Sequence, residues 1–322
     1  MSGVAETFSV PQERARRVHE KLRRELGGQV CSFLESSDVV EVMLNSDGGL
    51  WVERLGQPME RAGTMSASQA ESLMATVAST LRTTITRDNP ILECELPIDG
   101  SRFEAMIPPV VSAPVFVIRR RASRVFTLSD YVAAGIMSER QHEVIATAVA
   151  ERRNILVAGG TGSGKTTLAN AIIDHIEQVT PHHRLVIIED TAEIQCTVAN
   201  AVLLRATDTV DMLRLLKATM RLRPDRIVVG EVRGPEALAL LKAWNTGHPG
   251  GVATVHANSA PAGLIRLEQL IAEATPAPMR TLIAEAVDLI VGIARTSDGR
   301  RIQEVLAVER FDGSRYVLSA PE

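Results

Sequence analysis

The stretch GGTGSGKTTL, residues 159–168, decides the fold of this chain. It follows the apolar run NILVA (154–158) and opens a helical stretch, ANAIIDHIEQ (169–178). Its letters fit the spacing G-x-x-x-x-G-K-[ST] through Gly159, Gly164, Lys165 and Thr166. Glycines let the backbone turn so that successive N–H groups point at a phosphate, aided by the positive end of the following helix. A strand, this loop and a helix in that order predict a nucleotide-binding P-loop.

The P-loop predicts ATP and Mg²⁺ as ligands, with a role for each polar side chain. Lys165 is expected to bridge the β- and γ-phosphate oxygens, and the hydroxyl of Thr166 to bind the metal. The whole loop is the expected phosphate cradle, comprising Gly159, Gly160, Thr161, Gly162, Ser163, Gly164, Lys165, Thr166 and Thr167.

Short apolar runs alternate with helical stretches along the second half of the chain. They lie at 154–158, 185–189, 202–205, 226–230 and 251–255. They are rich in Val and Ile and apolar on both faces, which is typical of buried parallel strands. The predicted fold class is α/β: a P-loop NTPase (RecA-like) with a mostly parallel sheet and helices on both faces, preceded by a smaller α+β N-terminal domain. Ligands of such sheets bind beyond the carboxyl ends of the strands.

Acidic residues follow two of these runs, where hydrolysis would need them. The run at 226–230 is followed by Glu231, which we expect to orient or deprotonate the attacking water. In many P-loop NTPases the strand ends in a metal-holding aspartate, but Gly230 stands there, so Glu189 is the candidate to hold Mg²⁺ through water. Helix capping or a surface ion pair is the alternative for each carboxylate. Asp190, Glu193 and Arg233 stand in the same two stretches.

Two histidines flank the last apolar run, within TGHPGGVATVHANS (246–259). His256 follows the run, at the end expected to face the phosphates, and could hydrogen-bond the γ-phosphate. His248 precedes the run and is expected at the opposite end of the sheet. The alternative for both is an ordinary hydrogen-bonded histidine.

The periodicity divides the chain into a basic N-terminal helix (1–29), an α+β N-terminal domain (30–121), a linker (122–136) and the ATPase domain (137–322). Turns SDGG (46–49) and IDGS (98–101) suit hairpins of an antiparallel sheet.

The helix over 12–26 is basic, and it ends in the pattern at Gly27 and Gly28. Its apolar positions, Val18, Leu22 and Leu26, are one turn apart, so it either packs a narrow stripe on its own domain or contacts a membrane surface or partner. Its cationic residues are Arg14, Arg16, Arg17, Lys21, Arg23 and Arg24.

Composition limits the compartment and the partners. The net charge of −4 creates no overall field for nucleic acid, so DNA is not expected as the main ligand. The three cysteines are scattered, which argues against disulfides and against a zinc site. No signal peptide or membrane span is apparent, so we expect a protein of the cytoplasm.

Four ordered motifs carry a family resemblance: GGTGSGKTT, IIEDTAEI, RLRPDRIVVGEVRGPEAL and TGHPGGVATVHANSA. They resemble the Walker A, Asp box, Walker B and His box of the secretion traffic ATPases, which power type II and type IV secretion and type IV pili. The resemblance is strong over roughly residues 130–295. A short N-terminal domain without a four-cysteine module resembles the type IV secretion and conjugation branch, while pilus motors and type II secretion ATPases stay as alternatives.

The resemblance implies a partner set and a mechanism. Family members form hexameric rings on the inner face of the bacterial inner membrane, where they dock against channel components. Nucleotide lies between the two domains, and arginines of the N-terminal domain reach the phosphates. In FVIRRR, Arg119 and Arg120 match that role best, and Arg121 is a further candidate. A solvated strand end is the alternative for all of them.

Two other classes of function are open from the residues themselves. A small-molecule kinase is disfavoured because no arginine-rich lid interrupts the second region. A nucleotide-gated DNA-binding protein would use the basic helix, and its DNA complex would weaken strongly with salt.

Overall fold

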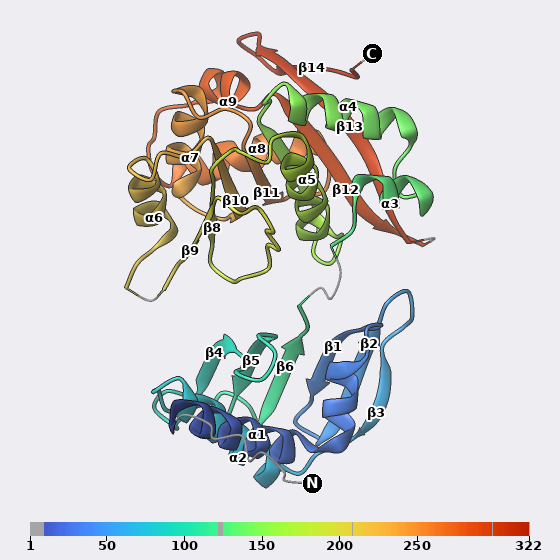
Figure 1. Cartoon of the computed structure of the whole chain (residues 1–322), viewed down its shortest axis with the longest axis vertical. Coiled ribbons are helices and arrows are strands. Elements are labelled where there is room, and N and C mark those ends of the chain that lie inside the picture. Colours follow the sequence, from blue (N-terminus) through green and yellow to red (C-terminus); the bar gives the residue numbers. More distant parts are fainter. Residues whose placement is uncertain (1–9, 122–124, 208, 298, 322) are drawn as a thin grey trace, which may run out of the picture. The chain divides into compact units, whose positions relative to one another are not determined.

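The structure is a computed structural model that describes residues 10–121, 125–207, 209–297 and 299–321. The chain folds as two compact units that divide at residue 123 (Figure 1). Residues 1–9 of the expected N-terminal segment, the side chain of Arg14 and linker residues 122–124 lie outside the described part.

The first unit is a six-stranded antiparallel sheet with helices on one face. The strands run in the order β3-β2-β1-β6-β5-β4. The elements are α1 (Val10–Glu35), β1 (Val39–Leu44), β2 (Gly49–Arg54), β3 (Glu60–Thr64), α2 (Ala67–Thr80), β4 (Ile91–Glu95), β5 (Arg102–Met106) and β6 (Val115–Arg119).

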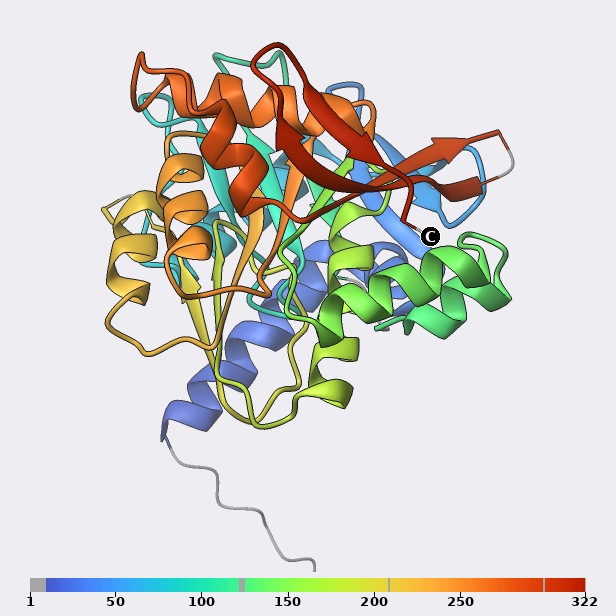
Figure 2. The ribbon, with the colours of Figure 1, turned by 90° about the horizontal axis from the view of Figure 1, so that it is seen from above.

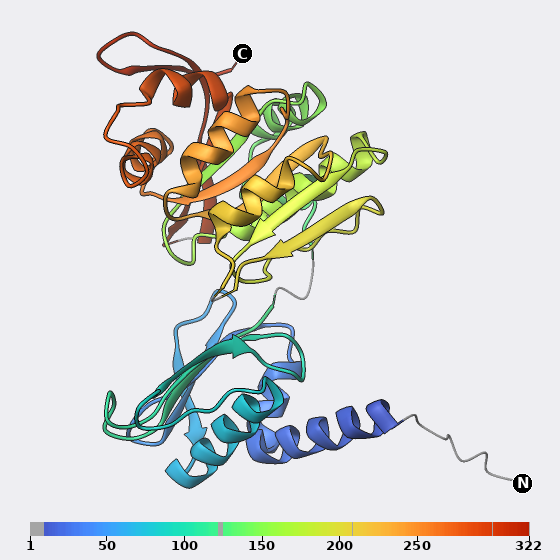
Figure 3. The same cartoon turned by 90° about the vertical axis from the view of Figure 1, so that its left-hand side faces the viewer.

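Helices α1 and α2 lie on the same side of this sheet (Figure 3). Alternate strand residues such as Val42, Phe103 and Ile118 are buried against them, as the period of two requires. The predicted hairpins are confirmed, with Gly48 and Gly100 at φ near +75° in their turns.

The basic helix packs on its own unit. Leu22 and Leu26 are buried in the core of the first unit, and Val18 packs against it, as one of the two interpretations of the sequence predicts. Gly27, at φ 78°, interrupts the helix as expected, but the helix resumes and runs to Glu35. The stretch after Gly27 was missed because a paired glycine normally ends a helix.

The second unit is an eight-stranded sheet in the order β14-β13-β12-β7-β11-β10-β8-β9. The strands from β12 to β9 in that order are parallel, and β13 and β14 extend the sheet antiparallel. The strands are β7 (Ile155–Gly159), β8 (Leu185–Glu189), β9 (Ala201–Arg205), β10 (Arg226–Val232), β11 (Val252–His256), β12 (Leu289–Thr296), β13 (Gly299–Phe311) and β14 (Tyr316–Ser319).

Helices cover both faces of this sheet. One face packs α3 to α5 and the other packs α6 to α9, each over its own buried cluster (Figure 2). The helices are α3 (Leu128–Ala133), α4 (Glu139–Ala150), α5 (Lys165–Val179), α6 (Met212–Thr219), α7 (Glu236–Asn245), α8 (Ala260–Ala272) and α9 (Arg280–Ala286). The predicted fold class, α/β with a mostly parallel sheet and a smaller α+β domain, is confirmed.

Two expectations of local structure need correction. The run at 202–205 forms a parallel strand, but β9 lies at the sheet edge and Leu203 is 55% exposed, so it is not buried on both faces. Part of the expected linker forms α3, because Thr127 and Asp130 make a capping box and Leu128 and Tyr131 pack into the second unit.

Among the described residues, no helix has the length and apolar character needed to cross a membrane.

Candidate functional site

The P-loop joins β7 to α5, as the sequence predicts. Gly162 and Gly164 have φ of 67° and 98°, which side chains rarely adopt. Gly159 has no room for a Cβ atom, which would lie 2.4 Å from Ser163 Oγ and 2.5 Å from the carbonyl oxygen of Ile293. Glycine is therefore required by conformation in the turn and by space at its start.

The loop residues are arranged as a phosphate cradle would need. Lys165 is nearly buried, and its Nζ donates to the carbonyl oxygen of Gly160 at 3.0 Å, so the ammonium group lies over the loop. The hydroxyl of Ser163 is buried and has no hydrogen-bond partner among the described residues. A buried polar atom without a partner costs free energy, and a phosphate oxygen would satisfy it. The P-loop therefore fits a nucleotide.

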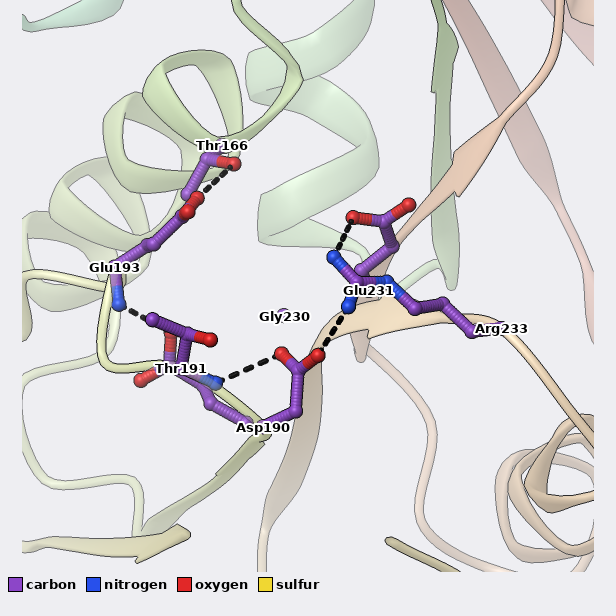
Figure 4. Close-up of a pocket in the computed structure, with 8 residues that line it drawn as sticks. Thr166, Asp190, Thr191, Glu193, Gly230, Glu231 and Arg233 are labelled. Atoms are coloured by element: carbon purple, nitrogen blue, oxygen red, sulfur yellow. Dashed lines mark hydrogen bonds and ion pairs between the residues drawn. The ribbon is translucent and has the colours of Figure 1, made fainter. Parts of the chain in front are cut away.

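Thr166 contacts Glu193, a carboxylate to which the sequence analysis assigns no role. Its Oγ1 donates to Glu193 Oε2 at 3.0 Å, and both residues line a small polar pocket (Figure 4). The remaining lining residues are Glu189, Asp190, Thr191, Gly230, Glu231 and Arg233. Hydroxyl and carboxylate oxygens are ligands that Mg²⁺ prefers, so the pair fits that ion. No cluster of three or more metal-ligating side chains occurs in the described residues.

Glu189 turns toward the loop that follows it. Its Oε1 accepts the backbone N–H groups of Glu193 at 2.9 Å and Ile194 at 2.7 Å, and the residue is only 4% exposed. Burial raises the pKa of Glu189 above its ordinary value, although these N–H groups act in the opposite direction. Glu189 therefore orders the loop that carries Glu193 to Thr166, a role that the sequence spacing does not reveal.

Glu231 is held by an arginine beyond the end of β10. Arg233 Nη2 donates to Glu231 Oε2 at 2.9 Å, and its Nη1 pairs with Asp190 Oδ2 (Figure 4). Burial lowers the pKa of Arg233, but Glu231 and Asp190 outweigh it, so the pKa lies above its ordinary value. The sequence shows Arg233 two residues after Glu231, but it does not predict that Arg233 joins Glu231 to Asp190.

The two histidines lie at opposite ends of β11. His256 ends the strand, pairs in register with Gly159 of the P-loop and has an exposed side chain. His248 precedes the strand, and its Nδ1 lies 3.0 Å from the carbonyl oxygen of Pro224, which precedes β10. The structure thus brings His256 to the P-loop edge and leaves His248 at the other edge.

The arginines of FVIRRR belong to the first unit and differ in their contacts there. Arg119 Nε lies 3.7 Å from Glu41 Oε1, on the sheet face that the helices leave open. Arg120 folds back and donates to the carbonyl oxygens of Ser36 and Val39, the latter at 3.1 Å. Arg121 Nη2 lies 3.9 Å from Glu95 Oε1. Arg120 thus holds the turn between α1 and β1, whereas the side chains of Arg119 and Arg121 are 41% and 45% exposed.

Comparisons with known proteins identify the family of this chain. Residues 29–311 match the family described as "Type II/IV secretion system protein". "Probable conjugal transfer protein TrbB" of Sinorhizobium fredii is 57% identical over 306 residues, which cover 95% of this chain and 94% of that protein. "Conjugal transfer protein TrbB" of Rhizobium radiobacter is 55% identical, with 93% of each chain covered. "Type IV secretion system protein PtlH" of Bordetella pertussis is 30% identical, over 87% of this chain and 93% of that one.

Solved structures share the fold. "ATPase DotB" of Legionella pneumophila has a TM-score of 0.62 at 19% identity, covering 95% of this chain and 83% of that one. The "Pilus Retraction Motor PilT" with bound ADP has a TM-score of 0.64 at 20% identity, covering 91% and 82%. The family resemblance predicted from the four motifs is confirmed: the chain belongs to the type II/IV secretion system protein family.

Proposed function

We propose that this chain hydrolyses ATP with Mg²⁺ and serves as a motor of a type IV secretion or conjugal-transfer system. One observation carries the chemical part: the P-loop, Glu193 beside Thr166, and Glu231 all lie at the carboxyl edge of one sheet. The names of the TrbB relatives support the biological part.

The residues would divide the work as follows. Backbone N–H groups of the loop from Gly159 to Thr167, with Lys165, bind the phosphates, and the hydroxyl of Ser163 finds its acceptor there. Thr166 and Glu193 hold Mg²⁺, directly or through water, while Glu189 fixes the loop between them. The ion, when bound, neutralises charge that develops on the phosphates. Glu231 orients the water and accepts its proton.

His256 and an arginine of the first unit complete the proposed site. His256 would hydrogen-bond the γ-phosphate from the end of β11. Arg119 is the first candidate for a phosphate contact, because Arg120 is engaged by two carbonyl oxygens of its own unit. Arginine suits this task since its guanidinium group stays charged and donates several hydrogen bonds to phosphate.

The mechanical output is proposed as motion of the units around a hexameric ring. Binding of ATP would draw the units together through the arginine, and loss of the γ-phosphate would release them. The ring would lie in the cytoplasm, peripheral on the inner face of the inner membrane, and dock against channel components. Pilus assembly or retraction and type II secretion are the alternatives within the family.

The experiment measures phosphate release by the purified full chain from ATP and Mg²⁺, without any acceptor molecule. We expect turnover by the wild type, while Lys165→Ala neither binds ATP nor releases phosphate. Turnover that requires an added acceptor would instead indicate a kinase. Wild-type protein that binds ATP without hydrolysing it, and binds DNA with strong salt dependence, would favour the nucleotide-gated DNA-binding alternative.

A further inference from the structure

Asp190 and Glu231 stand at the ends of neighbouring parallel strands. The strands pair in register up to Val229 of β10 and Ile188 of β8, and just beyond this pair Glu231 and Asp190 line the same small pocket. Like charges at such a position repel each other and would push the carboxylates apart. A cation between them relieves this repulsion and can hold both carboxylates in a fixed arrangement.

Arg233 supplies that cation with both ends of its guanidinium group. Nη2 donates to Glu231 Oε2 at 2.9 Å, and Nη1 pairs with Asp190 Oδ2. Planar guanidinium binds two carboxylates at once, which the single ammonium group of lysine cannot do with the same geometry. In the described residues, Oε1 of Glu231 accepts no hydrogen bond, so one oxygen is held and the other is available.

The backbone of Arg233 is fixed as well. Glu236, only 6% exposed, accepts the N–H groups of Arg233 at 2.7 Å and of Gly234 at 2.9 Å through its Oε1. Both bonds form in the turn that opens α7. Held at this turn, the side chain of Arg233 reaches back to the end of β10, two residues earlier. Glu236 thus fixes the backbone position of Arg233, from which the arginine side chain reaches Glu231.

We infer that Arg233 is a positioning residue that holds the carboxylate of Glu231 in the orientation needed to accept a proton from water. This inference rests on the proposed function, in which Glu231 is the general base. Arg233 acts through Glu231 and Asp190, and it is not assigned a contact with the nucleotide. Without Arg233, the side chain of Glu231 is free to rotate and is repelled by Asp190. The carboxylate of Glu231 then spends less time in the orientation that accepts the proton.

The test compares Arg233→Gln, Arg233→Lys and wild type in phosphate release and in the dissociation constant of ATP. Arg233→Gln is expected to lower kcat at least about tenfold, while ATP affinity stays within about twofold of wild type. Arg233→Lys should recover part of the loss, since one bond to Glu231 is restored. Arg153→Gln is the matched control, because Arg153 pairs with Glu151, also two residues earlier, at 2.7 Å, in the turn between α4 and β7. It should turn over like wild type.

Two results would overturn the inference. Wild-type kcat in Arg233→Gln would mean that Glu231 needs no positioning, and an equal loss of ATP affinity would make Arg233 a phosphate-binding residue. Glu231→Gln in the same assay separates this failure from failure of the proposed function. If Glu231→Gln is inactive while Arg233→Gln is normal, only the inference fails; if Glu231→Gln turns over normally, the role of Glu231 fails first.

Discussion

The two ends of strand β10 both carry arginine, yet the arginines do different work. Arg226 begins the strand and is fully buried, whereas Arg233, just past its end, has a half-exposed side chain. Arg226 donates to neutral partners: the carbonyl oxygens of Gly250 at 3.0 Å and Val149 at 2.9 Å, and Nδ1 of His183 at 3.1 Å. Among the described residues, the side chain of Arg233 pairs with two carboxylates that line the pocket, Asp190 and Glu231.

The difference teaches which polar residues build the fold and which are available for chemistry. Burial and the nearby Arg152 lower the pKa of Arg226 to about 10, so it remains charged at neutral pH and ties the loop before β11 to the ends of α4 and β10. Its hydrogen bonds are satisfied inside the protein. At the carboxyl end, the side chains of Arg233 and Glu231 are 50% and 24% exposed and so keep contact with solvent.

Arg226→Met should destabilise the second unit without altering its chemistry. It leaves buried carbonyl oxygens without donors, so we expect the free energy of unfolding to fall by about 3 kcal/mol. Urea unfolding followed by Trp244 fluorescence in a Trp51→Phe background reports this unit alone, because the chain has only these two tryptophans. Arg153→Met, which removes an exposed ion pair, should cost at most about 1 kcal/mol. A loss of turnover in folded Arg226→Met would contradict the claim that Arg226 only stabilises the fold.

Glu189 and Glu193 offer the same contrast within one loop. Glu189→Ala leaves two backbone N–H groups without an acceptor and should cost about 2 kcal/mol, whereas Glu189→Gln keeps the accepting oxygen and should cost little. Glu193→Gln should instead raise the Mg²⁺ concentration needed for half-maximal phosphate release several-fold, at unchanged stability. If Glu189→Gln raises the Mg²⁺ requirement and Glu193→Gln does not, Glu189 is the residue that holds the metal.

The histidines at the two ends of β11 should show the smallest effects on stability. His248→Ala removes one hydrogen bond at the amino end and should cost about 1 kcal/mol of stability, with normal turnover. His256→Ala, at the exposed carboxyl end, should keep its stability and lose turnover by about tenfold. Thermal unfolding and phosphate release on the same samples separate the two outcomes. If both variants lose the same stability and the same turnover, the end of β11 at which a histidine lies does not determine its role.

Much of the second unit follows from local pattern. The P-loop needs only its own glycines and the strand and helix on either side, and parallel strands bring every motif that follows them to one edge. Glu231 and His256 were placed correctly at that edge for this reason. The capping box at Ser138 and Gln141 likewise marks the start of α4 without tertiary information.

Other features depend on contacts that a sequence does not display. An arginine is normally a surface residue, so nothing local indicates that Arg226 is buried. The inward turn of Glu189 depends on the backbone of the loop after β8, and the bridge by Arg233 depends on β8 and β10 being neighbours. The sequence does not predict the antiparallel extension by β13 and β14, because residues 302–308, IQEVLAV, do not alternate apolar and polar residues.

The most direct test of the account is phosphate release by Glu231→Gln, measured together with ATP binding and urea unfolding. Gln keeps the shape of the side chain and removes the base, so we expect wild-type stability, retained ATP binding and a kcat lower by about 10²–10⁴-fold. Hydrolysis at the wild-type rate would contradict the assignment of the reaction to the carboxyl end of β10.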